Sequence, residues 1–336
     1  MANNIIKFCT AALAGSLIGV AYERWPHIKA DLFTGVSADS SLVPPKIPYD
    51  DSFYRPGNKI INVDPKVSAE NLVRSSRFGL PSKDNLRVFN DFVLSYDRRL
   101  RSPIWVLEHL HPGKLDLQNN VSRKHSKFQE DTAIHEYFRA TLKDFKGSHL
   151  DRGHMAAAAN HKMTQDDMDQ TFVLSNISPQ DQKLNSGAWE RLESYVRWLA
   201  KGSKNLYVVS GPLYLPHKAR DGNTYVTYRV IGNNMVSVPT HYFKVILTET
   251  KDDKLLMEAF LMPNDPKMTN DVKVDDYRVK ISDLNIIERA SGVIFFDALQ
   301  RDQVEAPLSL PSSFKPRVYD DNKTRLPQPT PNDMTK

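Results

Sequence analysis

The chain has 336 residues and a mass of 38.3 kDa, which suggests two domains or one large mixed domain. Hydrophobic residues make up 40% and charged residues 25%, which excludes a wholly disordered chain, a collagen-like chain and a polytopic membrane protein. A net charge of +5 permits a polyanionic partner without requiring one. Because Cys9 is the only cysteine, no intrachain disulfide and no zinc site built on several thiolates can form.

The N-terminal segment contains a short uncharged stretch from Phe8 to Tyr22. Its apolar run falls short of the roughly 20 residues that comfortably span a bilayer. A secretory signal would need a clearer small-residue cleavage site, and a mitochondrial presequence would need more basic residues than Lys7 alone. A buried core helix is a further alternative. We expect a mitochondrial leader or a short membrane anchor over residues 1–22.

Two segments have no sustained hydrophobic period. Residues 23–70 are rich in Pro, Ser, Asp and Lys, so we expect a linker there. Residues 306–336 are rich in proline, and we expect a disordered tail. The folded domain is therefore expected over residues 71–305.

Strands dominate the pattern of this central part. Alternating or continuous apolar runs predict strands at Phe92–Tyr96, Ile104–Leu107, Thr171–Ile177, Leu206–Ser210, Tyr225–Ile231, Tyr242–Thr248, Leu255–Met262 and Val293–Phe296. The clearest helix is Gly187–Ala200, because its apolar residues share one face. A second helix is expected from Ser282 to near Gly292. Runs of strands with few intervening helices favour an α+β class over a doubly wound parallel sheet.

The residues that indicate chemistry lie between Asp151 and Glu193. Taken singly, each has an ordinary structural interpretation. Asn185 precedes a helix and can cap it, Gly153 can mark a turn, and Glu193 with Arg197 can form a surface ion pair. None of these residues alone therefore identifies a site.

In combination, the same region favours phosphate chemistry. A neutral imidazole such as that of His154 can take a proton from water near pH 7. The guanidinium of the nearby Arg152 can hold a phosphate through parallel hydrogen bonds. The amide oxygen of Asn185 is a hard ligand that suits Mg²⁺, an ion that keeps several waters and so tolerates a single protein ligand. Glu193 follows Asn185 by eight residues, within a quarter-turn of the same helical face.

The order of motifs resembles that of a known family. Asp151–His161 is similar to the signature of the DNA/RNA non-specific endonucleases, the ββα-metal nucleases, and the mitochondrial members match best. The supporting segments are His135–Thr141, Thr171–Gln180, Ser210–Leu213, Val238–His241 and Glu288–Gly292. The resemblance covers roughly residues 75–300. It implies an α+β, ββα-metal (His-Me finger) nuclease fold with a central, mostly antiparallel sheet flanked by helices.

The resemblance also implies a role for each matching residue. His154 is the general base that activates water for attack on phosphorus, and Arg152 contacts the scissile phosphate. Asn185 is the direct ligand of Mg²⁺, with Mn²⁺ as a substitute, and Glu193 holds metal-bound waters. Asn176 helps to orient the site. The implied products carry 5′-phosphate and 3′-hydroxyl ends.

Two further residues have less certain roles in the matched region. Arg123 is expected to be a second phosphate contact, and Asp151 is expected to orient its loop. Met155 replaces the Leu that is common in related sequences, and Ser186-Gly187 differs from the usual pair after the metal ligand.

The implied partners are DNA and RNA, bound through the phosphate backbone, together with a second copy in a homodimer and a membrane that attaches the N-terminal segment. The family context implies a mitochondrial location, in the intermembrane space or at the inner membrane, with a nuclear location after release. The implied roles are mitochondrial DNA turnover and apoptotic DNA degradation.

Two alternatives remain open from the sequence. A mitochondrial 5′–3′ exonuclease of the same superfamily resembles the segment Trp105–His109, although Asp151 and the proline-rich tail favour the endonuclease. A catalytically silent nucleic-acid-binding protein or membrane-tethered scaffold would be expected to lack His154 or Asn185, and both are present. His161, with no helical carboxylate partner in the sequence, is interpreted as structural, as are His135 and His241.

Overall fold

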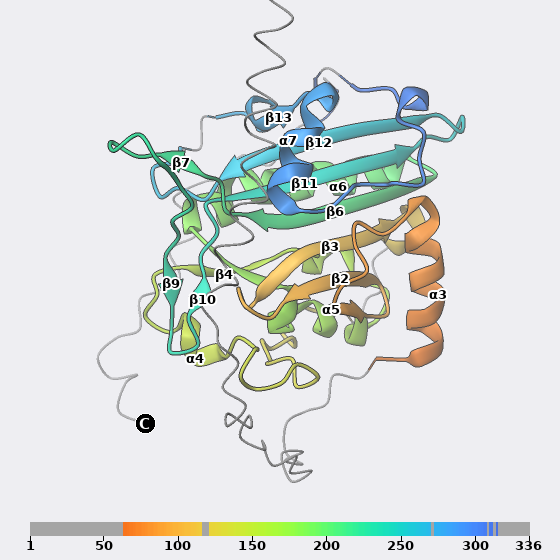
Figure 1. Cartoon of the computed structure of the whole chain (residues 1–336). Helices are drawn as coiled ribbons and strands as arrows, with labels where there is room; N and C mark the ends of the chain where they lie inside the picture. Colours follow the sequence, from red (N-terminus) through yellow and green to blue (C-terminus); the bar gives the residue numbers. More distant parts are fainter. Residues whose placement is uncertain (1–62, 116–120, 270–271, 308, 312–313, 315–336) are drawn as a thin grey trace, which may run out of the picture. The chain divides into compact units, whose positions relative to one another are not determined.

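The computed structural model describes residues 63–115, 121–269, 272–307, 309–311 and 314 (Figure 1). The expected leader or anchor at residues 1–22, and most of the expected linker and tail, lie outside this range. Within the described range, no helix has both the length and the apolar character needed to cross a bilayer.

The centre of the fold is a seven-stranded sheet with the order β1-β2-β3-β6-β11-β12-β13 (Figure 1). Every neighbouring pair of strands in it is antiparallel. The strands are β1 (Leu86–Val88), β2 (Phe92–Asp97), β3 (Ser102–Leu110), β6 (Asn205–Leu213), β11 (His241–Glu249), β12 (Leu255–Pro263) and β13 (Arg278–Val279). The expected α+β fold with a central antiparallel sheet is confirmed.

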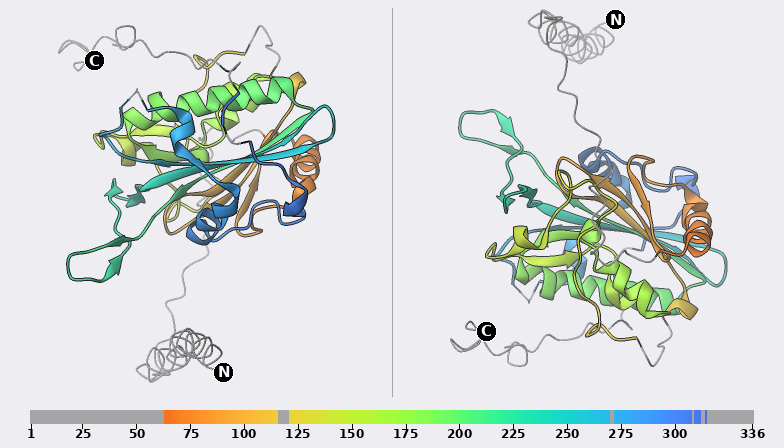
Figure 2. Two further views of the ribbon diagram at one scale, coloured as in Figure 1. Left: turned by 90° about the horizontal axis from the view of Figure 1, so that it is seen from above. Right: turned by 90° about the horizontal axis from the view of Figure 1, so that it is seen from below.

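One face of the sheet is covered by the helix α6 (Glu190–Gly202), which runs along it in Figure 2. Its residues Leu192 and Val196 are buried in one core with Val106 of β3 and Ile246 of β11. The apolar spacing read from the sequence therefore identified the buried face of this helix. A turn of different geometry precedes it, so α6 begins at Glu190 rather than at the expected Gly187.

The opposite face is covered by α7 (Leu284–Ser291) and flanked by α3 (Pro65–Ser75) (Figure 2). The Asp64 side chain caps α3 by accepting hydrogen bonds from two backbone amides of its first turn. α7 ends at Gly292, whose φ of 73° is left-handed and suits glycine. Residues 65–70, which we expected within the linker, are helical.

Three small two-stranded sheets lie outside the central one. They pair β4 (Asp151–His154) with β5 (Ile177–Gln180), β7 (His217–Lys218) with β8 (Thr224–Tyr225), and β9 (Val230–Ile231) with β10 (Val236–Ser237). The other helices are α4 (Leu142–Phe145), α5 (Gln165–Thr171), the π-turn η6 (Leu184–Trp189), and the 3₁₀ turns η2 (Ser76–Phe78), η3 (Pro112–Lys114), η4 (Ala158–Asn160), η5 (Leu174–Asn176), η7 (Val274–Tyr277), η8 (Ile281–Asp283) and η9 (Arg301–Gln303).

Three expected strands are wrong. Thr171–Ile177 contains the end of α5 and the turn η5, and only Ile177 belongs to a strand. Tyr225–Ile231 contains the last residue of β8 and the two residues of β9, with no strand between them. Val293–Phe296 is a non-strand segment whose phenylalanine side chains are buried in the core. A short apolar run reports burial, which a loop can satisfy as well as a strand.

In the centre of the sheet, the buried charged side chains all lie on one face. Ser210 of β6 lies opposite both Val106 and Lys244, so these residues share the α6 face. Glu108 and Glu258 lie in the next row on the same face. All three charged side chains are at most 2% exposed. The opposite face contains the apolar neighbours of these residues.

The outer edge of β12 is covered by two separate segments. β13 pairs with it over two residues, Ala259 and Phe260. Farther along, the backbone of Glu305 exchanges hydrogen bonds with Leu255 and Met257. The backbone of the single residue Glu305 therefore covers the N-terminal part of this edge.

Candidate active site

The candidate site is built from a two-stranded ribbon and a helix. β4 and β5 pair antiparallel, with Asp151 opposite Gln180 and His154 opposite Ile177. The chain then passes through η6 and enters α6, where it packs against the central sheet. The sequence motif therefore forms the expected ββα arrangement. Gly187 in η6 departs from helical geometry, with φ −115° and ψ −108°, so Asn185 precedes a break in the helix.

His154 sits at the end of β4 in an aromatic environment. Its imidazole is 8% exposed and lies 4.7 Å from the Phe172 ring and 5.4 Å from the Phe128 ring, measured between ring centroids. Its Nε2 atom is buried and has no hydrogen-bond partner in the described part of the chain. Burial, together with the positive charges of Arg123, His161 and Arg152, lowers the pKa of His154 to about 3. The imidazole is therefore neutral at physiological pH, the form that a general base requires.

Arg152 and Arg123 each lie against one of these two rings. The Arg152 guanidinium carbon is 4.2 Å from the centre of the Phe128 ring, and that of Arg123 is 5.7 Å from the centre of the Phe172 ring. Both arginine side chains are exposed. The two cations thus flank the imidazole, where they can attract a phosphate and are held by cation–π contacts.

Asn176 uses its side chain to brace the backbone beside His154. Its Oδ1 accepts a hydrogen bond from the Ala156 amide at 2.9 Å, and its Nδ2 donates to the carbonyl oxygens of Ala156 and Thr171. Its backbone carbonyl accepts from the Met155 amide at 3.0 Å. This geometry fits the expected orienting role and commits the side chain to backbone groups.

Asn185 is oriented by Asp151. The Asn185 Nδ2 atom donates to Asp151 Oδ2 at 2.9 Å, which joins η6 to the first residue of β4. Because its amide nitrogen is engaged with a carboxylate, the Oδ1 atom remains the group of this side chain suited to a cation. In the described residues no group of three His, Cys, Asp or Glu side chains is placed to hold a metal ion. The Asn185 amide oxygen is a hard donor, which fits a divalent cation of the kind that takes oxygen ligands.

Glu193 lies on α6 in a desolvated position. Burial raises its pKa to about 7, and the nearby charges of Lys244 and Arg197 act in the opposite direction. The suggested surface ion pair with Arg197 is not formed, because Arg197 donates instead to Ser194 Oγ and, at 3.5 Å, to Asn160 Oδ1. A half-buried carboxylate near other charges is more typical of a functional group than of a solvated surface ion pair.

Comparison with known proteins agrees with this geometry. Residues 70–302 match the family described as DNA/RNA non-specific endonuclease. The chain belongs to this endonuclease family.

Individual relatives give the same result. Human mitochondrial endonuclease G is 44% identical over 220 residues, which cover 66% of this chain and 72% of that protein. The Caenorhabditis elegans protein of the same name is 37% identical over 295 residues, which cover 86% of this chain and 92% of that protein. The Xenopus laevis mitochondrial nuclease EXOG is 42% identical over 234 residues, which cover 69% of this chain and 64% of that protein.

A solved structure also matches this endonuclease. It is titled as an EndoG/EndoGI complex that reveals a mechanism of EndoG inhibition, and it is 45% identical with a TM-score of 0.68. The match covers 70% of this chain and 95% of that one. The resemblance to mitochondrial endonucleases inferred from the motifs is confirmed, and the chain is a hydrolytic nuclease with the ββα fold.

Gly153 has a steric reason to be glycine in this endonuclease. A Cβ atom at this position would lie 2.0 Å from Gln180 Oε1 and 2.3 Å from Gln180 Cδ. The Gln180 side chain is fully buried, so it has little room to move. The glycine in the motif therefore permits close packing between the two strands of the ribbon.

Sequence reasoning missed the aromatic residues of the endonuclease site. Phe128 and Phe172 surround His154, and the indole of Trp189 donates to the His154 carbonyl oxygen at 3.4 Å. The periodicity of α6 predicted Trp189 to be buried, but no pattern placed it beside the base. Phe128 lies in an irregular segment without a motif, so only the folded arrangement identifies it.

Proposed function

We propose that this protein is a Mg²⁺-dependent, sugar-non-specific endonuclease that hydrolyses phosphodiester bonds in DNA and RNA to give 5′-phosphate and 3′-hydroxyl ends. The observation that carries the proposal is the neutral, desolvated imidazole of His154 between two exposed arginines. A phosphodiester attracted by Arg152 and Arg123 would lie beside a group able to accept a proton from water. Contacts of this kind address the backbone rather than the bases, which suits cleavage without sequence preference.

Each residue has a part in the proposed reaction. His154 accepts the proton of the attacking water, and Arg152 and Arg123 bind the phosphate oxygens. Asn185, held by Asp151, and Glu193 are the residues that would hold the cation and its waters. Mg²⁺, with Mn²⁺ as a substitute, would supply stabilisation of the negative charge on the leaving 3′-oxygen. Asn176 keeps the backbone around His154 in place.

The cellular part of the proposal has support from the names of the relatives, which are described as mitochondrial. We place the protein in the mitochondrion, in the intermembrane space or at the inner membrane, with nuclear entry after release. Its roles there would be mitochondrial DNA turnover or apoptotic DNA degradation. The proposal includes a homodimer, tested by light scattering, and membrane attachment through residues 1–22, tested by fractionation of mitochondria.

Cleavage of supercoiled plasmid and of single-stranded RNA tests the activity, with Mg²⁺ and with EDTA. We expect cleavage of both substrates only with the metal, and a loss of about 10²- to 10⁴-fold in rate for His154→Ala. His217→Gln, which changes an exposed histidine on the β7–β8 hairpin, is the matched control. Metal-independent cleavage, or full activity of His154→Ala, would overturn the assignment.

The same assay separates the second candidate function. The match to EXOG makes a 5′–3′ exonuclease of the same superfamily the alternative. An exonuclease would degrade linear DNA from its ends and leave closed circles intact, whereas the proposed endonuclease nicks the circles.

A further inference from the structure

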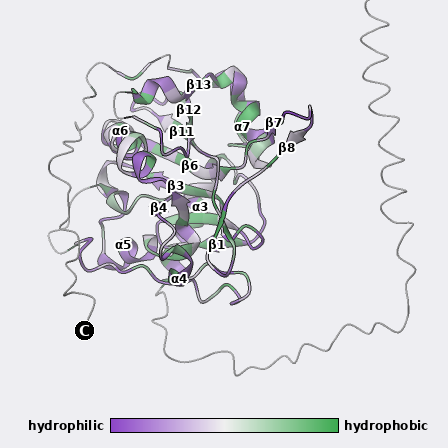
Figure 3. Cartoon of the chain, turned by 90° about the vertical axis from the view of Figure 1, so that its left-hand side faces the viewer, coloured by the Kyte–Doolittle hydropathy of each residue, from purple (hydrophilic) through white to green (hydrophobic). Residues whose placement is uncertain are grey.

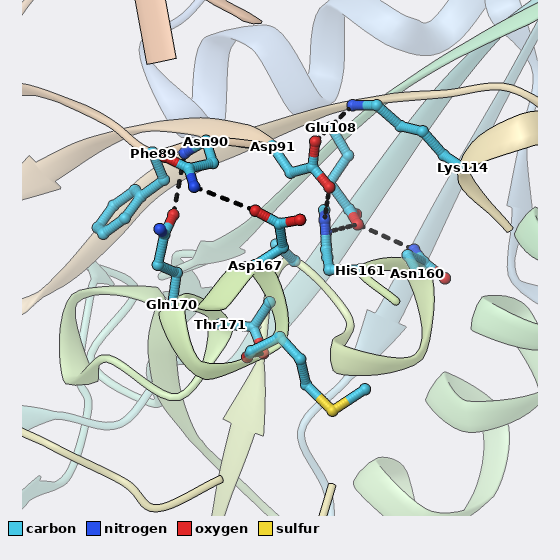
Figure 4. Close-up of polar contacts among 12 residues, drawn as sticks. Phe89, Asn90, Asp91, Glu108, Lys114, Asn160, His161, Asp167, Gln170 and Thr171 are labelled. Atoms are coloured by element: carbon cyan, nitrogen blue, oxygen red, sulfur yellow. Dashed lines mark hydrogen bonds and ion pairs between the residues drawn. The ribbon is translucent and has the colours of Figure 1, made fainter. Parts of the chain in front are cut away.

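A buried polar cluster joins β3 to the segment that follows β4, and the proposed reaction makes no use of it (Figure 4). At its centre is His161, which has no exposed surface. Its Nε2 atom is 3.0 Å from Glu108 Oε1, and its Nδ1 atom is 3.4 Å from Asp91 Oδ2. Lys114 Nζ lies 2.9 Å from the other oxygen of Asp91. We call these four side chains the His161 cluster.

The charges of the His161 cluster balance when the histidine is protonated. Burial disfavours a charged imidazole, but the hydrogen bonds and charges of Asp91 and Glu108 outweigh it and raise the pKa of His161 to about 9. Against the same effect of burial, His161 and Lys114 hold the pKa of Asp91 well below its usual range. With His161 protonated, each of the two acidic side chains of the cluster faces a basic one. Buried charges persist in this way only when they are paired.

The cluster fixes the far end of the segment that follows His154. Glu108 Oε1 accepts a hydrogen bond from Asn160 Nδ2 at 2.9 Å as well as the contact with His161 (Figure 4). Asn160 Oδ1 in turn accepts from Arg197 of α6 at 3.5 Å. The near end of the segment is held by Asn176. Residues 155–161 thus connect the His154 strand to β3 and to the helix that contains Glu193.

The loop that supplies Asp91 is also held in place. Its neighbour Asn90 donates from its backbone amide to Gln170 Oε1 at 2.9 Å and from Nδ2 to Asp167 Oδ1 at 3.1 Å (Figure 4). Both acceptors belong to α5, a short helix of mostly hydrophilic residues (Figure 3). The carboxylate of Asp91 is therefore presented to His161 from a constrained backbone.

We propose that His161 is a positioning residue for phosphodiester cleavage. Together with Asn160, it binds the segment after His154 to Glu108 of β3. These contacts set the position of the His154 imidazole relative to α6 and Asn185. The proposal rests on the proposed function, since it concerns the same site. The position of the base affects the rate of cleavage, because displacement of a reacting group by about 1 Å can cost roughly 100-fold in rate.

The experiment compares the full-length protein with His161→Gln and with the control His217→Gln. Plasmid cleavage is measured under steady-state conditions at a temperature where circular dichroism shows each variant to be folded. We expect His161→Gln to lower kcat by about 10- to 100-fold with little change in KM, because the arginines that bind phosphate are untouched. An unchanged kcat in the folded variant, or a change in KM alone, would overturn the proposal.

A second readout does not depend on cleavage. Spectra of ring-labelled histidine at neutral pH report the environment of His154 directly. We expect His161→Gln to shift the His154 ring resonances and His217→Gln to leave them in place. If the wild type does not cleave nucleic acid, the proposed function fails, and this spectrum still tests the positioning role. Unchanged His154 resonances would overturn that role.

If His161→Gln alone does not fold, the double variant Glu108→Gln, His161→Gln serves instead. It removes one charge of each sign and leaves the Asp91–Lys114 pair intact, so the buried charge stays balanced. We expect it to fold and to retain the loss of kcat. A folded double variant with wild-type kcat would overturn the proposal.

Discussion

The two faces of the central sheet differ in what they bury. The face toward α6 contains the charged side chains of Glu108, Lys244 and Glu258 in the centre of three strands. The face toward α7 carries no buried charged side chain in the centre of these strands, and its residues His109 and Glu249 lie near strand ends. One sheet thus separates two tasks, because its apolar face stabilises the fold while the other face carries buried charges behind the helix that contains Glu193.

We expect the largest loss of stability when a charge is removed from the face toward α6. Lys244 lies 4.5 Å from the centre of the Trp189 ring, and its charge is felt by both Glu108 and Glu193. Lys244→Met keeps the volume but removes a buried cation that both carboxylates interact with, so we expect a loss of roughly 3–5 kcal/mol in unfolding free energy. Urea titration measures it, and plasmid cleavage should fall in parallel. Wild-type stability of this variant would contradict the interdependence of these charges.

The apolar face should separate stability from activity. Ile287 of α7 is fully buried on that face. We expect Ile287→Ala to cost about 2–5 kcal/mol in unfolding free energy, because it leaves a cavity. At temperatures where the variant is folded, its kcat should equal that of wild type. A selective loss of kcat in the folded variant would show that the two faces are coupled.

The His161 cluster predicts how the stability of the charged face depends on pH. The folded pKa of His161, about 9, exceeds the unfolded value of roughly 6.5, so its stabilisation is complete below the lower value and is lost as the pH rises through the higher one. We expect the difference in unfolding free energy between wild type and His161→Gln to shrink by about 3 kcal/mol from about pH 6 to about pH 10. Denaturant titrations across this range measure it. A constant difference would mean that His161 is not charged in the folded protein.

The smallest effect is expected at the rim of the site. Phe128→Leu removes the ring beneath Arg152 but keeps an apolar side chain there. A cation–π contact at an exposed site contributes about 0.5–1 kcal/mol, so we expect KM to rise about two- to fivefold with kcat nearly unchanged. Phe138→Leu, at a partly exposed ring elsewhere, is the control. An unchanged KM would exclude the ring as a support for the phosphate contact.

The sequence predicted much of the fold because its long strands and α6 have clear patterns. β11 extends one residue beyond its predicted bounds at each end, and β12 extends one residue beyond its predicted C-terminal bound. The prediction failed at Thr171–Ile177, where apolar side chains pack around a turn and only Ile177 pairs with another strand. A sheet pattern depends on a partner strand, and a single segment does not reveal whether one exists.

For the candidate site, the sequence indicates residue types but not the side chains that support them. The motif predicted His154, Arg152 and Asn185, and the structure brings each of them to the ββα unit. The partners of His161 could not be identified from the sequence, because Asp91 and Glu108 lie far from it along the chain in other parts of the fold. The opposite charge states of these two buried histidines follow from partners supplied by folding.

The covering of the β12 edge has a consequence for self-association. A nine-residue strand with an open row of amide and carbonyl groups is a template for another chain, and the sequence of β12 is largely apolar. Here Glu305 occupies part of that edge through its backbone hydrogen bonds. Proteolytic removal of the chain after residue 300 would uncover the row, and the trimmed protein is then expected to aggregate by strand addition while its remaining core is still folded.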